Sequence, residues 1–161
     1  MAQGLLRRRL DELGVGRRVR IDSAGISAGM QGNPPDPRAQ AQLLSLGIDI
    51  RRLRARAVKP RDFRQFDYIL GMEKQHMEWL QQHARDDSRA RLALLMEFSE
   101  LPDQLEVSDP YHGDSAGFAQ VLALLQRGVA GFSAGVLEPE LRARGLLSNQ
   151  EPNRRSDEPE R

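Results

Sequence analysis

The chain has 161 residues, of which 39% are hydrophobic and 29% are charged, and its formal net charge is +1. This length and composition predict one globular domain with a substantial core, and a charge so near zero favours neither nucleic acid nor a membrane as a partner. Cysteine is absent, which excludes disulfides, thiolate metal sites and a cysteine nucleophile within this polypeptide. No apolar run reaches about 18 residues and the start lacks a signal-peptide pattern, so we expect a cytoplasmic protein.

The first part of the chain predicts a helix, a strand and a second helix. Leucines recur at helical spacing through residues 5–13, and Gly14 follows as a stop signal. Residues 19–24 alternate between apolar and polar side chains, which is typical of a half-buried strand. After a loop, Asp36 is placed to cap a helix whose first residue is Pro37.

The remainder of the chain continues to alternate between strands and helices. Residues 66–72 form a short apolar run typical of a buried strand, and residues 75–83 have a helical pattern. Residues 92–98 predict another strand, and apolar side chains from 118 to 132 predict a long amphipathic helix. Such an order predicts an α/β fold: a three-layer arrangement of a parallel sheet with helices on both faces.

The same pattern predicts the domain boundary and the place of the site. From residue 148 onward the chain is polar and contains proline, so we expect an α/β domain over residues 1–147 and a disordered tail over residues 148–161. Ligands of open parallel sheets bind beyond the carboxyl ends of the strands, so the loops after Ala24, Met72 and Val107 are expected to meet at one rim.

Seven short segments, in this order, resemble the low-molecular-weight protein-tyrosine-phosphatase family. They are residues 22–25, 33–39, 47–50, 54–56, 62–63, 66–70 and 109–111. Each is a weak signal alone, but the ordered set covers roughly residues 1–135. The resemblance implies a phosphotyrosine protein phosphatase I-like fold. It also implies hydrolysis of a phosphorylated protein or a small aryl phosphate through a phosphocysteine intermediate, with no metal and no other cofactor.

One part of the family pattern has no counterpart in this chain. In the family, a loop of sequence Cys-x5-Arg-Ser-Pro follows the first, central strand and binds phosphate, and Met-Ala-Glu-Gly comes next. This chain opens with Met1-Ala2-Gln3-Gly4. We therefore expect the first strand and the phosphate loop to be missing, unpaired strand edges beside residues 19–24 and 66–72, and no catalysis by the chain as written.

Two explanations for this difference stay open. The first is an enzyme whose chain has been started at an internal methionine, so that the complete parent hydrolyses phosphotyrosine. The second is a non-catalytic interaction protein derived from a phosphatase. An in-frame Cys-x5-Arg-Ser-Pro stretch in the DNA upstream of the Met1 codon would favour the first, and an immediate stop codon the second.

The resemblance implies roles for four residues of this chain. Asp109 matches the general acid that protonates the leaving phenolate. Tyr111 and His112 would form one wall of the substrate cleft, and no cluster of ligands accompanies His112 to suggest a metal. Ser23 matches a serine that supports the phosphate loop, although a hydroxyl at a strand end can equally satisfy a turn.

Several positions depart from the family or have a plainer interpretation. Gly29 and Met30 stand where the family has an aromatic recognition residue, and Glu73 replaces an aspartate, which predicts an altered substrate preference. A basic stretch is interpreted as a solvated connection rather than an anion site. Its members are Arg51, Arg52, Arg54 and Arg56.

Overall fold

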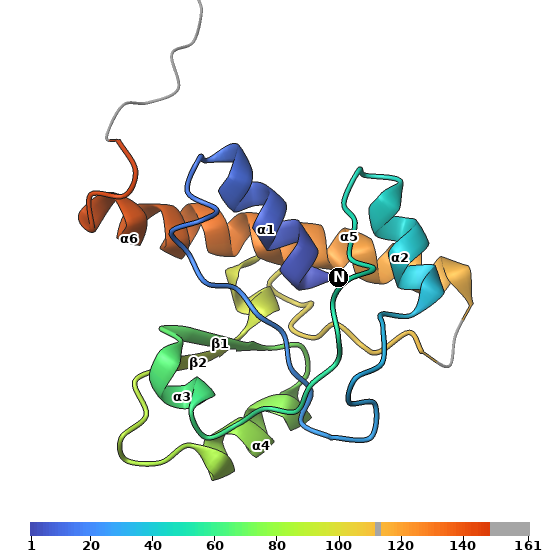
Figure 1. Ribbon diagram of the computed structural model, residues 1–161, viewed down its shortest axis with the longest axis horizontal. Coiled ribbons are helices and arrows are strands. Elements are labelled where there is room, and N and C mark those ends of the chain that lie inside the picture. Colours follow the sequence, from blue (N-terminus) through green and yellow to red (C-terminus); the bar gives the residue numbers. More distant parts are fainter. Residues whose placement is uncertain (112–113, 149–161) are drawn as a thin grey trace, which may run out of the picture.

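The computed structural model describes residues 1–111 and 114–148, so His112 and the tail beyond Ser148 lie outside the described residues. Figure 1 shows a long helix running across the molecule, with shorter helices beside it and a small sheet on its other side. The elements in chain order are α1 (Ala2–Glu12), α2 (Pro37–Leu44), α3 (Asp62–Gln65), β1 (Tyr68–Gly71), α4 (Lys74–His83), β2 (Arg91–Leu94), a 3-10 helix η1 (Leu95–Phe98), α5 (Ser115–Phe132), a π-helical turn η2 (Ser133–Leu137) and α6 (Glu138–Ala143).

The two strands of the described residues pair in parallel and are covered on both faces. Tyr68 of β1 lies opposite Arg91, and Gly71 opposite Leu94. The Tyr68 ring meets the Phe132 ring of α5 at a centroid distance of 5.3 Å. A Cβ atom on Gly71 would lie 3.2 Å from Sδ of Met77 in α4. Residues 68 and 71 point to opposite faces of a strand, so α5 and α4 cover opposite faces, and the predicted three-layer α/β arrangement is confirmed.

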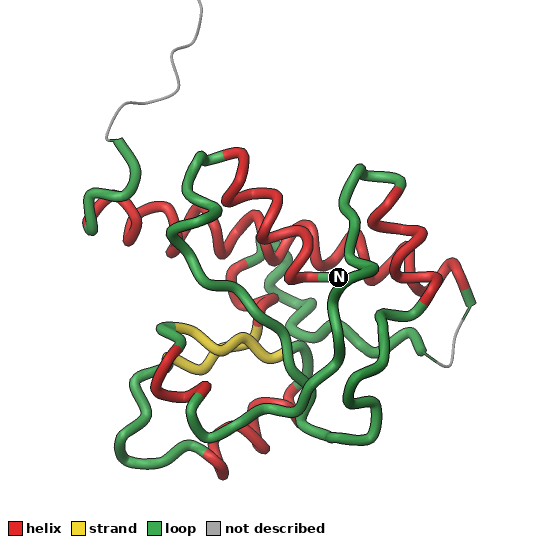
Figure 2. The backbone as a smooth tube through the Cα atoms, viewed as in Figure 1, coloured by secondary structure: helices red, strands yellow, loops and turns green. Residues whose placement is uncertain are grey.

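The strand predicted over residues 19–24 is wrong. The segment has no regular secondary structure, and Figure 2 shows the chain between α1 and α2 as loop throughout. Next to this segment, the strand-like pairing found in the described residues is one parallel bridge between Gly25 and Ala57. The apolar side chains of residues 19–24 find other partners: Val19 and Ile21 pack against a small cluster around Leu10 and Leu141. A strand needs a ladder partner for its backbone groups, which a side-chain pattern cannot supply.

The third predicted strand, residues 92–98, is half right. It pairs only as far as Leu94 and then turns into the 3-10 helix η1. The Glu97 side chain accepts a hydrogen bond from the Leu94 backbone N–H at 2.9 Å, which closes that turn. Leu95 and Met96 are then buried against Gly128 of α5, where a Cβ atom would lie 2.8 Å from Cγ of Leu95.

The helices follow the predicted pattern more closely. Helix α1 ends before Gly14, which has the positive φ of 71° that glycine accepts without steric cost. Helix α2 begins with Asp36 as its cap and Pro37 as its first residue, as predicted. Helix α5 spans the predicted amphipathic segment, and all but the first of its inward residues form the main core with residues of α1, α2 and η1. The inward residues are Phe118, Leu122, Leu125, Val129 and Phe132.

The helical stretch Ala116–Ala143 also has the length and mean hydropathy, 1.2, of a membrane-spanning helix, and it is the one such stretch in the described residues. By itself this is weak evidence, because the core helix of a soluble protein meets the same two conditions. Here Leu122, Leu125, Val129 and Phe132 of α5 belong to the main hydrophobic core, and Leu141 of α6 to a smaller cluster.

Candidate active site

The loop of residues 107–111, called the Asp109 loop below, lies just beyond the carboxyl end of β1. The Val107 N–H donates to the carbonyl of Met72 at 2.8 Å, which ties the start of the loop to the end of the strand. The Asp109 N–H donates to Oε1 of Glu73 at 3.2 Å, and the Tyr111 N–H donates to Oδ1 of Asp109 at 2.9 Å. Of the three loops expected to meet at one rim, those after Met72 and Val107 are joined by these contacts, whereas the loop after Ala24 is bridged through Gly25 to Ala57. The Asp109 side chain remains exposed.

Arg38 joins the other end of this loop to α2 and α5. Its own N–H donates to Oδ1 of Asp36, as in a standard helix cap, and its guanidinium forms an ion pair with the same carboxylate at 2.8 Å. The guanidinium also donates to the carbonyl of Tyr111 at 2.9 Å and lies over the Phe118 ring, 4.4 Å from its centroid. The hydrogen bond from Arg38 lowers the pKa of Asp36 below its usual value, against a smaller opposing effect of burial.

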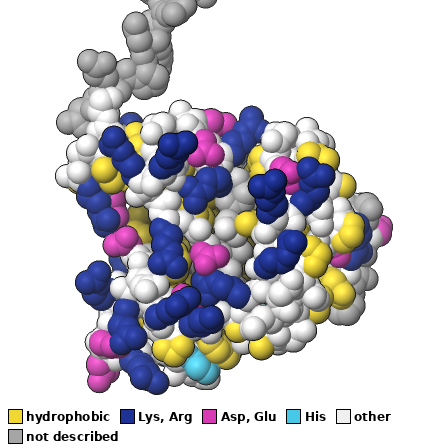
Figure 3. Space-filling model, in the orientation of Figure 1, with side chains coloured by type: hydrophobic (Ala, Val, Ile, Leu, Met, Phe, Trp, Pro, Cys, Tyr) yellow, Lys and Arg dark blue, Asp and Glu magenta, His cyan; other side chains and the backbone are white. Residues whose placement is uncertain are grey.

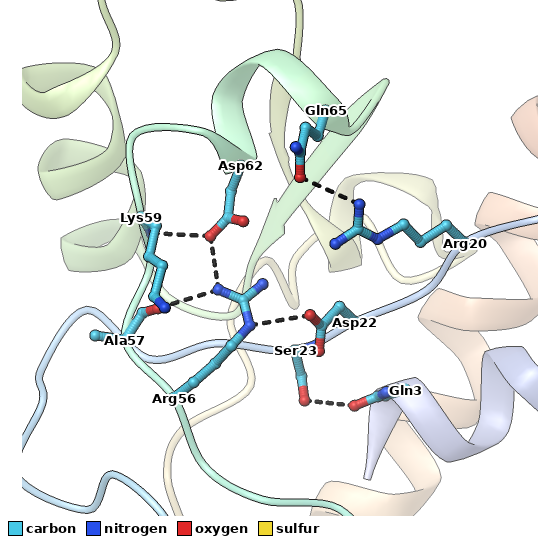
Figure 4. A network of polar contacts seen from close by, with 9 residues as sticks. All are labelled: Gln3, Arg20, Asp22, Ser23, Arg56, Ala57, Lys59, Asp62 and Gln65. Carbon is cyan, nitrogen blue, oxygen red and sulfur yellow. Dashed lines mark hydrogen bonds and ion pairs between the residues drawn. The ribbon is translucent and has the colours of Figure 1, made fainter.

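Ser23 is held against the first turn of α1. Its hydroxyl donates to Oε1 of Gln3 at 2.6 Å, and its backbone N–H donates to the neighbouring Asp22 side chain. Figure 4 shows this contact beside the extended segment that follows α1. The structure therefore brings Ser23 to the beginning of α1, whereas the contacts of Asp109 are with Glu73 and Tyr111.

The interpretation of the basic stretch as solvated is wrong for Arg56. Its guanidinium bridges Asp22 at 2.9 Å and Asp62 at 2.6 Å, and Asp62 also accepts the Lys59 N–H at 2.8 Å (Figure 4). Burial raises the pKa of Asp62, but its hydrogen bonds with Arg56 and the Lys59 N–H outweigh burial and bring the pKa below its usual value. Arg51, in contrast, forms an exposed ion pair with Asp49.

The remaining predicted positions fall on the surface or outside the described residues. Tyr111 is 49% exposed and Met30 is 52% exposed, and His112 lies outside the described ranges. The described part of the chain contains no group of three or more His, Asp or Glu residues that could hold a metal. Figure 3 shows basic side chains scattered over much of the face in view, with acidic ones among them.

Three residues around the site were not predicted from the sequence as partners. They are Gln3, Arg38 and Glu73 in its contact with Asp109. One signal could have found Arg38: an aspartate followed two residues later by an arginine is a local pattern, and Asp49 and Arg51 repeat its spacing without a helix. Glu73 meets Asp109 from 36 residues away, and no local spacing reveals such a pair.

Comparison with known proteins assigns this chain to a family. Residues 1–142 match the family described as low molecular weight phosphotyrosine protein phosphatase. The chain belongs to this family, whose members are protein-tyrosine phosphatases.

Individual relatives support the assignment over most of their length. The low molecular weight phosphotyrosine protein phosphatase of Schizosaccharomyces pombe is 35% identical over 119 residues, which are 73% of this chain and 76% of that protein. The crystal structure of Primo-1 superposes with a TM-score of 0.79 at 30% identity, covering 84% of this chain and 88% of the other. The crystal structure of YfkJ from Bacillus subtilis superposes with a TM-score of 0.76 at 28% identity, covering 86% of each chain.

Proposed function

We propose that Asp109 is the general acid of a phosphotyrosine phosphatase site, and that the 161-residue polypeptide does not turn over phosphate esters by itself. One observation carries the first part: the exposed Asp109 carboxyl lies beyond the carboxyl end of β1, where ligands of parallel sheets bind. The second part is supported by the absence of any cysteine from the sequence.

The chemistry requires both a nucleophile and a proton donor. In the reaction that family membership implies, a thiolate forms an S–P bond while the ester P–O bond breaks, and the acid gives its proton to the departing phenolic oxygen. A phenolate is a poor leaving group because the pKa of a phenol is about 10. Asp109 can supply the proton, but this chain has no side chain to supply the thiolate.

The other predicted residues complete the proposal. Tyr111 and His112 would line the substrate side of the Asp109 loop, and Ser23 would support a phosphate-binding loop at the beginning of α1. The substrates would be phosphorylated proteins or small aryl phosphates in the cytoplasm, with neither nucleic acid nor a membrane as a partner. Gly29 and Met30 supply no aromatic side chain, which favours a broader preference than phosphotyrosine.

Phosphate release tests both parts of the proposal. The 161-residue chain should release no phosphate from phenyl phosphate or p-nitrophenyl phosphate above a buffer blank. A version with a β-strand and a Cys-x5-Arg-Ser-Pro loop added before Met1 should release phosphate from both. In that version, Asp109→Asn should lower kcat on phenyl phosphate by about 10²- to 10⁴-fold, and less on p-nitrophenyl phosphate, whose leaving group is better.

Asp103→Asn is the matched control, since Asp103 is an exposed aspartate in the same connection between η1 and α5. Turnover by the unmodified chain would contradict the proposed inactivity. Equal kcat values for the Asp109 and Asp103 variants of the extended chain would contradict the role of Asp109 as acid.

A further inference from the structure

We propose that Arg38 is a positioning residue: by holding the carbonyl of Tyr111, its guanidinium sets where the Asp109 carboxyl lies. The proposal rests on the proposed function, because it concerns the loop that carries the general acid. Arg38 stands on α2, 71 positions before Asp109 in the sequence, and its guanidinium reaches the loop through Tyr111.

The guanidinium of Arg38 is held on three sides. Nε donates to Oδ1 of Asp36 at 3.0 Å, and one terminal nitrogen donates to Oδ2 at 2.8 Å, which makes a bidentate ion pair. The same terminal nitrogen donates to the Tyr111 carbonyl at 2.9 Å, and the plane lies over the Phe118 ring. Only a planar group with several fixed N–H donors meets all three partners, so a lysine could replace it in part but not in full.

Holding Tyr111 also fixes Asp109, because the two residues share one turn. The Tyr111 N–H donates to the Asp109 carboxylate, so the position of that carboxylate follows the Tyr111 backbone. Glu73 accepts the Asp109 N–H at the other end of the turn. Between them, Pro110 packs on α5, where a Cβ atom on Gly117 would lie 3.6 Å from that of Pro110. The loop is therefore anchored at both ends, by Glu73 and by Arg38.

A second arginine on this chain provides a matched control. Arg51 repeats the local geometry of Arg38, with its N–H donating to Oδ1 of Asp49 at 2.9 Å and its guanidinium pairing with both oxygens. In the described residues, the hydrogen bonds of its guanidinium are all with Asp49, and 68% of its side chain is exposed. Substitution of Arg51 therefore removes an equivalent local ion pair but leaves the hydrogen bonds of the Asp109 loop in place.

The experiment is nuclear magnetic resonance on the isotope-labelled 161-residue chain and its variants Arg38→Ala, Arg38→Lys and Arg51→Ala. Arg38→Ala should shift the ¹³C resonance of the Tyr111 carbonyl and speed exchange of the Asp109 and Tyr111 amides by about tenfold. Arg38→Lys should restore part of both effects. Arg51→Ala should leave the loop signals within about twofold of the parent chain, as expected for an exposed pair.

The backbone amide of Gln40, which donates to the Asp36 carbonyl, reports whether α2 is still formed. If Arg38→Ala loses that signal, the comparison is made with Arg38→Lys, which keeps the charge. Loop signals in a folded Arg38 variant that match those of Arg51→Ala would overturn the proposal. No step of the measurement needs turnover, so failure of the general-acid assignment and failure of the positioning role are distinguished.

Discussion

Asp62 and Glu138 are the buried carboxylates of the described residues, and each lies against an arginine. Arg56 contacts Asp62, and Arg9 donates to Glu138 at 2.7 Å. A carboxylate loses hydration when it is buried, and charge-assisted hydrogen bonds compensate for that loss. Removing the arginine would take away a large part of that compensation, whereas an exposed pair such as Arg64 with Asp87 contributes little.

The effect of Asp62 on stability should depend on pH. Its folded pKa lies below the ordinary value of 3.8, so its stabilisation is present above that value and is lost as the pH falls through the lower, folded pKa. At pH 7, Asp62→Asn should reduce the free energy of unfolding by about 1–3 kcal/mol. Urea unfolding from pH 7 to pH 3 should show this difference shrinking at the acid end, while Asp87→Asn has a small effect throughout. A difference for Asp62→Asn that is constant over this range would contradict the linkage.

Residues were predictable where the information is local. Asp36 was predicted as a helix cap because its position immediately before Pro37 is a local signal. Asp109 and Tyr111 were found through a motif, and their proposed roles rest on that motif. Arg56 was misinterpreted because one of its partners, Asp22, is 34 residues away, and the local run of arginines suggested only a solvated stretch.

At the scale of elements, α5 and the end of η1 lie closer together than they could if residue 131 had a side chain. A Cβ atom on Gly131 would lie 1.7 Å from the carbonyl oxygen of Phe98, which is backbone and cannot move aside as a side chain can. The absence of a side chain at Gly131 therefore allows α5 to lie against η1. The rings of Phe98 and Phe132, 5.2 Å apart, meet at the same crossing.

Gly131→Ala should be strongly destabilising. We expect it to lower the free energy of unfolding by about 3 kcal/mol or more, because the helices must separate to admit the methyl group. Gly135→Ala is the control: its Cβ atom would meet no atom within 4 Å, and alanine favours helix by up to about 1 kcal/mol. Chemical unfolding of both variants measures the difference, and equal stabilities would contradict the packing argument.

Helices were predicted better than strands, for a physical reason. A helix satisfies its backbone hydrogen bonds within one segment, so periodicity and caps are enough to locate α1, α2 and α5. A strand requires a partner elsewhere in the chain, and residues 19–24 have the pattern of a strand without that partner. The end of β2 was missed because Glu97 closes a turn through a single side-chain hydrogen bond.

At the scale of the whole fold, β1 has one paired edge and one edge that no strand of the described residues covers. The Arg91 N–H donates to the Asp67 carbonyl, and backbone groups alternate along a strand, so Ile69 and Gly71 face β2 while Tyr68 and Leu70 face away. The segment after α1 lies near this side of the sheet, where Arg20 donates to Gln65 at 3.1 Å. Its contacts there are made by side chains rather than by a backbone ladder (Figure 4).

Hydrogen exchange should reveal the two edges of β1. In the 161-residue chain, the amides of Tyr68 and Leu70 should exchange at least about tenfold faster than those of Ile69 and Gly71, because only the second pair donates across the ladder. The measurement contains its own control, since all four amides belong to one strand. Equal rates within the strand would mean that another segment covers the open edge.

The π-helical turn between α5 and α6 sets the direction in which the side chains of α6 point around the helix axis. Each residue added to a helix rotates everything after it by about 100°, so a turn that holds one residue more than an α-helical turn redirects all later side chains. Leu141 faces Leu10 and Val15 because of this rotation. A chain shortened by one residue at Gly135 would continue as a uniform spiral, with Leu141 pointing more than a quarter turn away from both.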